Sequence, residues 1–217
     1  MNRNFEILTP SPSSVIRPTH PAPAGVRAWP DFFNPINPNS QKMEAPMRLY
    51  EVVHLFARRL GLKVGRVRAI AGKLQDEGKL QKTEGSRRFP LDVSEPEVVT
   101  LLLALLGESG IGTGPSAAKT FGDLATLDGE RFAVFLEDLL FGQPKHVRHL
   151  MVRQNPSGVS VTADNMHLLF GEPPSRGNAS PARIVPGEAL TAIAAELQGQ
   201  APEQADAAAA LNAIGRL

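Results

Sequence analysis

The amino-acid sequence predicts a mainly α-helical fold with a small β component. Apolar residues recur at three- and four-residue steps through several stretches after residue 47, which is the pattern of amphipathic helices. Alternation typical of strands is confined to residues 79–92 and 147–170. These patterns predict a helical domain with a hairpin at 47–106, a Gly-rich linker at 107–120, a small α+β domain at 121–198 and an Ala-rich C-terminal helix at 199–217.

Residues 1–46 are expected to be a disordered tail. They hold nine of the nineteen prolines of the chain, and proline both removes an amide donor and restricts φ. Neither a helix nor a central strand is compatible with that spacing. The prolines are Pro10, Pro12, Pro18, Pro21, Pro23, Pro30, Pro35, Pro38 and Pro46.

Two helices joined by a short turn are predicted at the start of the first domain. Gly61 and Gly78 each follow an apolar stripe at the position where glycine commonly ends a helix. The first stripe is Leu49, Val52, Val53, Phe56, Ala57 and Leu60, and the second is Val64, Val67, Ile70, Ala71 and Leu74.

A hairpin and a third helix follow. Residues 79–82 and 88–91 are expected to be its strands, around a turn at 83–86. Ser94 and Glu97 have the spacing of a capping box, so a helix is expected to begin there and to run to about Leu106. Because that helix is apolar on nearly every side, we expect it to be the buried centre of the domain.

The second domain is expected to pair helices with a three-stranded meander. The meander strands are predicted at 147–153, 159–162 and 166–170, with a loop at 171–183 and helices at 186–197 and 201–217. A helical region at 121–141 carries an apolar stripe, which comprises Phe132, Phe135, Leu136, Leu139 and Leu140. Since a small sheet is marginal unless it is covered, we expect this stripe to pack on the meander, and the unit to form a homodimer.

Basic charge is concentrated in residues 48–91. This segment has eleven Lys and Arg against four Asp and Glu, a net charge of +7, whereas the rest of the chain carries −6. Concentrated basic charge is typical of a phosphate-binding surface, so we expect double-stranded DNA as the partner. The candidate base-reading residues are Arg66 and Arg68, the candidate phosphate contacts are Arg58, Arg59, Lys63 and Lys73, and the candidate hairpin contacts are Lys82, Arg87 and Arg88.

Residues 52–82, VVHLFARRLGLKVGRVRAIAGKLQDEGKLQK, resemble the helix-turn-helix of MerR-type and related winged-helix regulators. They are also similar to small DNA-binding proteins carried by proteobacterial phages and prophages. The junctions Leu60-Gly61-Leu62 and Asp76-Glu77-Gly78-Lys79-Leu80 carry the resemblance, although Lys79 stands where an apolar residue is usual, and neither a coiled coil nor a metal-sensing cysteine follows. The resemblance implies a winged helix-turn-helix that binds specific DNA sequences as a cytoplasmic transcriptional regulator.

Other classes of function find little support in the sequence. The chain has no cysteine, and no apolar run approaches the ~18–20 residues of a membrane span. Gly112 to Thr120 lacks phosphate-loop spacing, and His146 and His149 would point to opposite faces of a strand. We therefore expect no enzyme activity, cofactor or metal. Two alternatives remain open: an adaptor that marks a DNA site for packaging or replication, and a protein-interaction module that binds no DNA.

Overall fold

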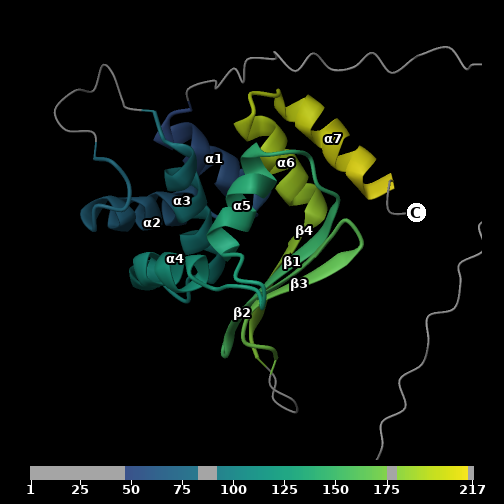
Figure 1. The fold of residues 1–217 in the computed structure, drawn as a ribbon. Coiled ribbons are helices and arrows are strands. Elements are labelled where there is room, and N and C mark those ends of the chain that lie inside the picture. The colour runs from purple at the N-terminus through teal and green to yellow at the C-terminus, as the bar shows by residue number, and fades with distance from the viewer. Residues whose placement is uncertain (1–46, 83–91, 175–179, 215–217) are drawn as a thin grey trace, which may run out of the picture. The chain divides into compact units, whose positions relative to one another are not determined.

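The computed structural model describes residues 47–82, 92–174 and 180–214, which form helices and one small sheet (Figure 1). The helices are α1 (Leu49–Arg59), α2 (Val64–Asp76), α3 (Glu95–Gly107), α4 (Gly114–Gly122), α5 (Phe132–Phe141), α6 (Gly187–Leu197) and α7 (Pro202–Ile214), with a short 3₁₀ turn η1 (Ile111–Thr113) before α4. The strands are β1 (Val147–Gln154), β2 (Ser157–Ala163), β3 (Met166–Gly171) and β4 (Ala182–Pro186). The predicted mixture of helices with a small β part is confirmed.

The sheet is antiparallel throughout, in the order β3-β2-β1-β4. The first three strands are the predicted meander. The fourth strand, β4, was not predicted from the sequence. It lies where we expected the end of a loop and the start of a helix. β4 has only five residues and ends at Pro186, so its sequence carries little strand signal.

The helices lie on one side of the sheet (Figure 1). α3 and α6 contact β1, and α4 contacts β2. Side chains alternate along β1 accordingly: Leu150 and Val152 are fully buried under the helices, whereas His149 and Met151 on the other face are half-buried.

One continuous hydrophobic core extends from α1 to α6. α3 lies at its centre, since every residue from Leu101 to Gly107 is buried, as the sequence predicted. We expected two domains joined by a linker at 107–120, but that stretch contains η1 and α4. Two of its glycines serve close packing: a Cβ at Gly107 would overlap the ring of Phe121, and one at Gly114 would lie 3.0 Å from Ile70.

The predicted helical region 121–141 is interrupted. α4 ends at Gly122, and the chain then makes a tight connection, in which Ala125 bridges Arg131, before α5 begins. The apolar stripe of α5 is buried as predicted. In this stripe, the ring centroids of Phe132 and Phe135 lie 5.2 and 5.4 Å from that of Phe170 on β3, respectively. These contacts place α5 against the meander.

The predicted hairpin is covered only in part. Residues 79–82 are described and form no strand, and residues 83–91 lie outside the described part of the chain, as do residues 1–46. The capping box at the start of α3 is confirmed, with the backbone N–H of Ser94 donating to Glu97 at 2.9 Å. None of the helices described is both long enough and apolar enough to cross a membrane.

Candidate nucleic-acid interface

α1 and α2 are joined by a four-residue turn. Gly61 adopts φ +65°, a left-handed conformation that glycine accepts without strain, and the N–H of Leu62 then donates to the carbonyl of Ala57 at 2.8 Å. α2 begins at Val64 and buries one face against the core, as predicted. That face consists of Val67, Ile70, Ala71 and Leu74.

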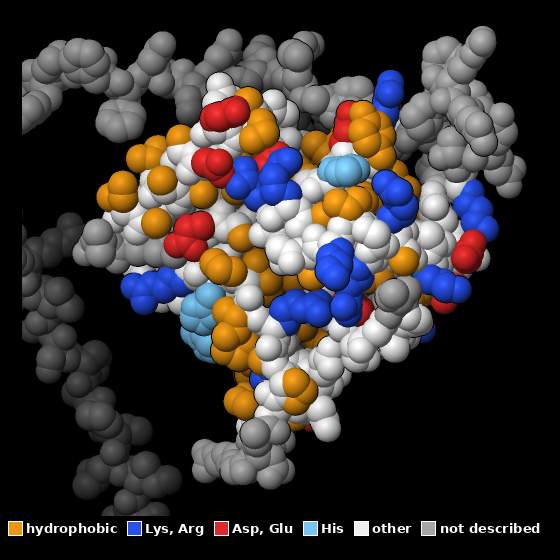
Figure 2. Space-filling model, turned by 180° about the vertical axis from the view of Figure 1, so that it is seen from behind, with side chains coloured by type: hydrophobic (Ala, Val, Ile, Leu, Met, Phe, Trp, Pro, Cys, Tyr) orange, Lys and Arg blue, Asp and Glu red, His pale blue; other side chains and the backbone are white. Residues whose placement is uncertain are grey.

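The opposite face of α2 is open and bears cations. Lys63, Arg68 and Lys73 are exposed, and none of them forms an ion pair with a residue that the structure describes. Between them on the helix surface lie Gly65 and Gly72, where an added Cβ would meet nothing within 4 Å. Figure 2 shows Lys and Arg side chains grouped near the centre of one face of the molecule, with Asp and Glu mostly around them.

Arg66, one of the two expected base-reading residues, is instead tied to the protein. Its Nε and Nη2 donate to the two carboxylate oxygens of Glu108 at 3.0 and 2.9 Å. The Glu108 side chain is fully buried, and it also lies 3.5 Å from the guanidinium of Arg183 on β4. To reach DNA, Arg66 would have to leave Glu108. This would be unfavourable, because a buried carboxylate without its partner costs free energy.

Arg58 and Arg59, at the end of α1, are held in the same way. Both pair with the buried carboxylate of Glu196 on α6, and Arg59 also pairs with Asp206 on α7. Burial would lower the pKa of Arg59, but its bonds to Asp206 and Glu196 outweigh burial and raise it. The charges of these two arginines are therefore largely neutralised within the chain.

The remaining candidates lie near the predicted hairpin. Lys82 pairs with Asp76 at 3.2 Å, whereas Arg87 and Arg88 lie outside the described residues.

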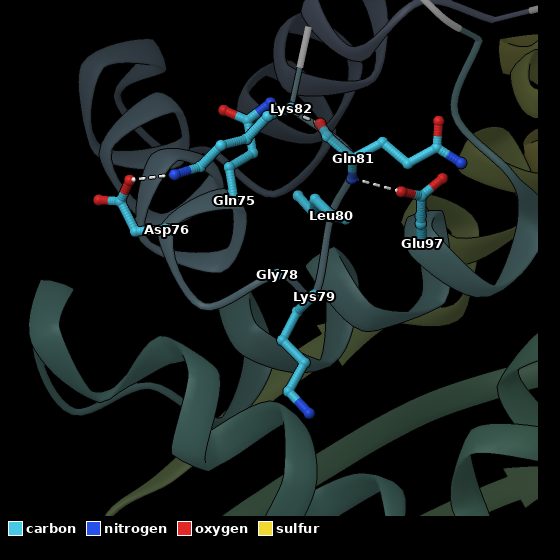
Figure 3. Close-up of a pocket in the computed structure, with 8 residues that line it drawn as sticks. All are labelled: Gln75, Asp76, Gly78, Lys79, Leu80, Gln81, Lys82 and Glu97. Carbon is cyan, nitrogen blue, oxygen red and sulfur yellow. Dashed lines mark hydrogen bonds and ion pairs between the residues drawn. The ribbon is translucent and has the colours of Figure 1, made fainter. Parts of the chain in front are cut away.

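Lys82 also lines a pocket of ≈ 420 Å³ between the end of α2 and the start of α3 (Figure 3). Several of its polar groups are engaged within the protein, since Gln75 donates to the carbonyl of Gln81 and the N–H of Gln81 donates to Glu97. We therefore assign no ligand to this pocket.

Hydrogen bonds to the carboxylate lower the pKa of Glu97. Burial alone would raise the pKa of this carboxyl, but the backbone N–H groups of Ser94 and Gln81 and the Ser94 hydroxyl bond to the ionised form and lower it. Glu97 thus fixes both the start of α3 and the chain segment that leaves α2.

The carboxylates that neutralise these arginines were not found from the sequence. Glu108 is 42 residues from Arg66, and Glu196 is 137 residues from Arg59, so no local pattern links them. The only available signal was the net charge of −6 outside the basic segment, which complements the +7 within it.

Of the histidines considered as metal ligands, His149 on β1 and His167 on β3 lie opposite the same residue of β2, Thr162. His146 lies 3.3 Å from Asn212 on α7, and His167 lies within 3.4 Å of the hydroxyls of Ser160 and Thr162. Over 47–82, 92–174 and 180–214, no group of three or more metal-binding side chains occurs.

Comparisons of the chain with protein-family models, curated proteins and solved structures find no match.

Proposed function

We propose that the protein binds double-stranded DNA by placing α2 in the major groove, and that it acts as a transcriptional regulator in the cytoplasm of a bacterium or a phage-infected host. The observation that carries the proposal is the outward face of α2. That face holds Arg68 and Lys73, with Lys63 at its start, and each of these cations lacks an acidic partner among the described residues.

The dimensions of α2 suit this role. A helix of 13 residues is about 20 Å long, and the major groove of B-DNA is about 12 Å wide. The open surface at Gly65 and Gly72 would let the helix backbone approach the floor of the groove closely. Arg68 then lies in the groove, where a guanidinium can bond guanine O6 and N7 together, whereas Lys63 and Lys73 lie where phosphates pass.

The other candidate residues take secondary places in this proposal. Arg58 is half-exposed and Arg66 is 42% exposed, so each could touch DNA only at the expense of its bond to Glu196 or Glu108. A winged helix-turn-helix, with Lys82, Arg87 and Arg88 beside a flanking groove, remains a prediction. The position of bound sites relative to promoters would separate a regulator from an adaptor for packaging or replication.

Selection of bound sequences from a random duplex pool tests the proposal, followed by affinity measurements on variants. On the selected site, Arg68→Ala should cost about 1–3 kcal/mol and relax one base position. Lys63→Ala should weaken binding to all duplexes alike and lower the salt slope by about one. Arg148 is an exposed arginine on β1, so Arg148→Ala is a matched control that should leave affinity unchanged.

Two outcomes would contradict the proposal. The first is a wild-type protein that binds no duplex at low salt, which would favour a protein-interaction module. The second is equal weakening by Arg68→Ala, Lys63→Ala and Arg148→Ala, which would mean that DNA responds only to total charge.

A further inference from the structure

β3 is an edge strand of the sheet, and among the described residues only the connection between α4 and α5 makes a backbone hydrogen bond to its outer side (Figure 1). A sheet edge exposes backbone N–H and C=O groups that can pair with another strand, and proteins usually protect such edges with proline, charge or a covering segment. The opposite edge, β4, follows Pro181, ends at Pro186 and carries Arg183. β3, with the sequence MHLLFG, contains neither proline nor a Lys, Arg, Asp or Glu residue.

The register shows which groups of β3 point outward. β2 and β3 are joined by Asp164 and Asn165, with φ of 47° and 62°, a two-residue turn flanked by the pair Ala163 and Met166. In such a hairpin the flanking pair is hydrogen-bonded, and inward and outward groups then alternate. Met166, Leu168 and Phe170 therefore bond to β2, whereas the backbone groups of His167 and Leu169 face away from it.

An independent contact supports this alternation. Gly171, two residues beyond Leu169, donates its N–H to the carbonyl of Ala125 at 2.9 Å, on the side away from β2. The connection between α4 and α5 thus covers the last residue of the edge. No such bond to another described segment is made by His167 or Leu169.

Two exposed hydrophobic side chains lie near opposite ends of this edge. Met166, at its start, is 60% exposed, and Leu127 is fully exposed. Leu127 belongs to the tight turn in which Thr126 donates to Glu130 at 2.9 Å, two residues after Ala125, so it lies near the Gly171 end.

We propose that β3 pairs antiparallel with β3 of a second copy of the chain, about a twofold axis at Leu168, to give a continuous eight-stranded sheet. His167 of each copy would exchange two backbone hydrogen bonds with Leu169 of the other. Because the twofold axis reverses the edge, Met166 would lie beside Leu127 of the partner subunit, and the contact would occur twice. This self-complementarity favours a second copy over an unrelated peptide, and the inference does not depend on DNA binding.

A disulfide experiment tests the geometry directly. The chain has no cysteine, so Leu168→Cys would introduce one thiol per subunit at the proposed axis. Facing residues in a non-hydrogen-bonded antiparallel pair have Cα atoms ≈ 4.5 Å apart, within the ≈ 4.4–6.8 Å that a disulfide spans. Mild oxidation should give a covalent dimer of Leu168→Cys. The control Ile184→Cys, on β4 at a more exposed position than Leu168, should stay largely monomeric.

Sedimentation of the otherwise unmodified chain provides the second test. An edge contact of this size is in the weak class, so the dimer should appear over about 5–500 µM. Leu127→Lys and Met166→Lys should each raise the dissociation constant about tenfold or more, equivalent to about 1.4 kcal/mol, whereas Ile184→Lys should not. Leu169→Pro should abolish pairing, since it removes an outward N–H, and circular dichroism would check its fold.

The outcomes that overturn the proposal are definite. They are a strictly monomeric wild-type chain over that concentration range, a dimer that Leu127→Lys and Met166→Lys leave intact, or equal crosslinking of Leu168→Cys and Ile184→Cys. Association with an unrelated peptide but not with a second copy would also overturn it. Leu127 is fully exposed, so its substitution should not compromise folding.

Discussion

Arg66→Ala and Arg68→Ala should separate a structural arginine from one available to a ligand. The two residues lie two positions apart on α2, and both were predicted from the sequence to contact DNA bases. In the structure Arg66 makes two bonds to Glu108, whereas Arg68 has no ion pair with a described residue. Arg66→Ala should therefore reduce the free energy of unfolding, and Arg68→Ala should leave it nearly unchanged.

The size of the effect follows from the burial of Glu108. Removing one partner of a buried ion pair costs about 3–5 kcal/mol, because the other charge is left without compensation. Here Arg66 is 42% exposed, and Arg183 remains 3.5 Å from the carboxylate, so we expect a smaller loss of about 2–3 kcal/mol. For a chain of this size the corresponding drop in melting temperature is roughly 5–10 °C, against about 0.5 kcal/mol or less for Arg68→Ala.

Denaturant unfolding measures the free energy of unfolding of both variants. The same measurement on Glu108→Ala and on the double variant Arg66→Ala/Glu108→Ala completes a double-mutant cycle. The cycle should give a coupling of about 1–3 kcal/mol between Arg66 and Glu108. A coupling near zero, or equal destabilisation by Arg66→Ala and Arg68→Ala, would refute the reasoning. Either result would mean that Arg66 and Glu108 are not bound to each other in solution.

The remaining predictions concern packing and pH. Gly72→Ala should stabilise the protein by about 0.5–1 kcal/mol, because the position is open and lies inside a helix, whereas Gly107→Ala should destabilise it by about 1–3 kcal/mol through overlap with Phe121. Thermal unfolding would check both, and two changes of the same sign would contradict the packing described. The folded-state pKa of Glu97 is lowered, so its stabilisation is present above the unfolded pKa and is lost as pH falls through the folded pKa. The stability difference between wild type and Glu97→Gln should therefore shrink as pH falls from about 7 to 3, and a difference independent of pH would exclude this role.

Local signals explain the part of the fold that could be predicted. α1 and α2 each combine an apolar stripe with a glycine just beyond the end, and α3 has a capping box, so a few neighbouring residues specify each helix. The turn at Asp164 and Asn165 marks the meander in the same way, since both residues tolerate positive φ.

The missed features depend on contacts between distant residues. β4 is a strand because Ala182 to Pro186 pairs with β1, and nothing in those five residues alone requires it. Gly107 resembles a linker residue in the sequence, but it provides the close approach that Phe121 needs. The candidate site was predicted as a set of cations, and only tertiary structure shows which of them already have partners.

Arg59→Gln and Lys63→Gln test that distinction on either side of the turn between α1 and α2. Both residues were expected to contact phosphates, but Arg59 is 15% exposed and binds Glu196 and Asp206, whereas Lys63 is exposed and has no ion pair with any described residue.

Arg59→Gln leaves Glu196 with the half-exposed Arg58 as its one cationic partner among the described residues, so it should lower the free energy of unfolding by about 1–3 kcal/mol and leave the salt slope of DNA binding unchanged. Lys63→Gln should do the reverse: it should lower the salt slope by about one, with little effect on stability. If Arg59→Gln reduces the salt slope as much as Lys63→Gln does, then Arg59 leaves Glu196 to bind phosphate. The carboxylates of α6 and α7 would in that case compete with DNA for the end of α1, rather than serve only to hold the fold together.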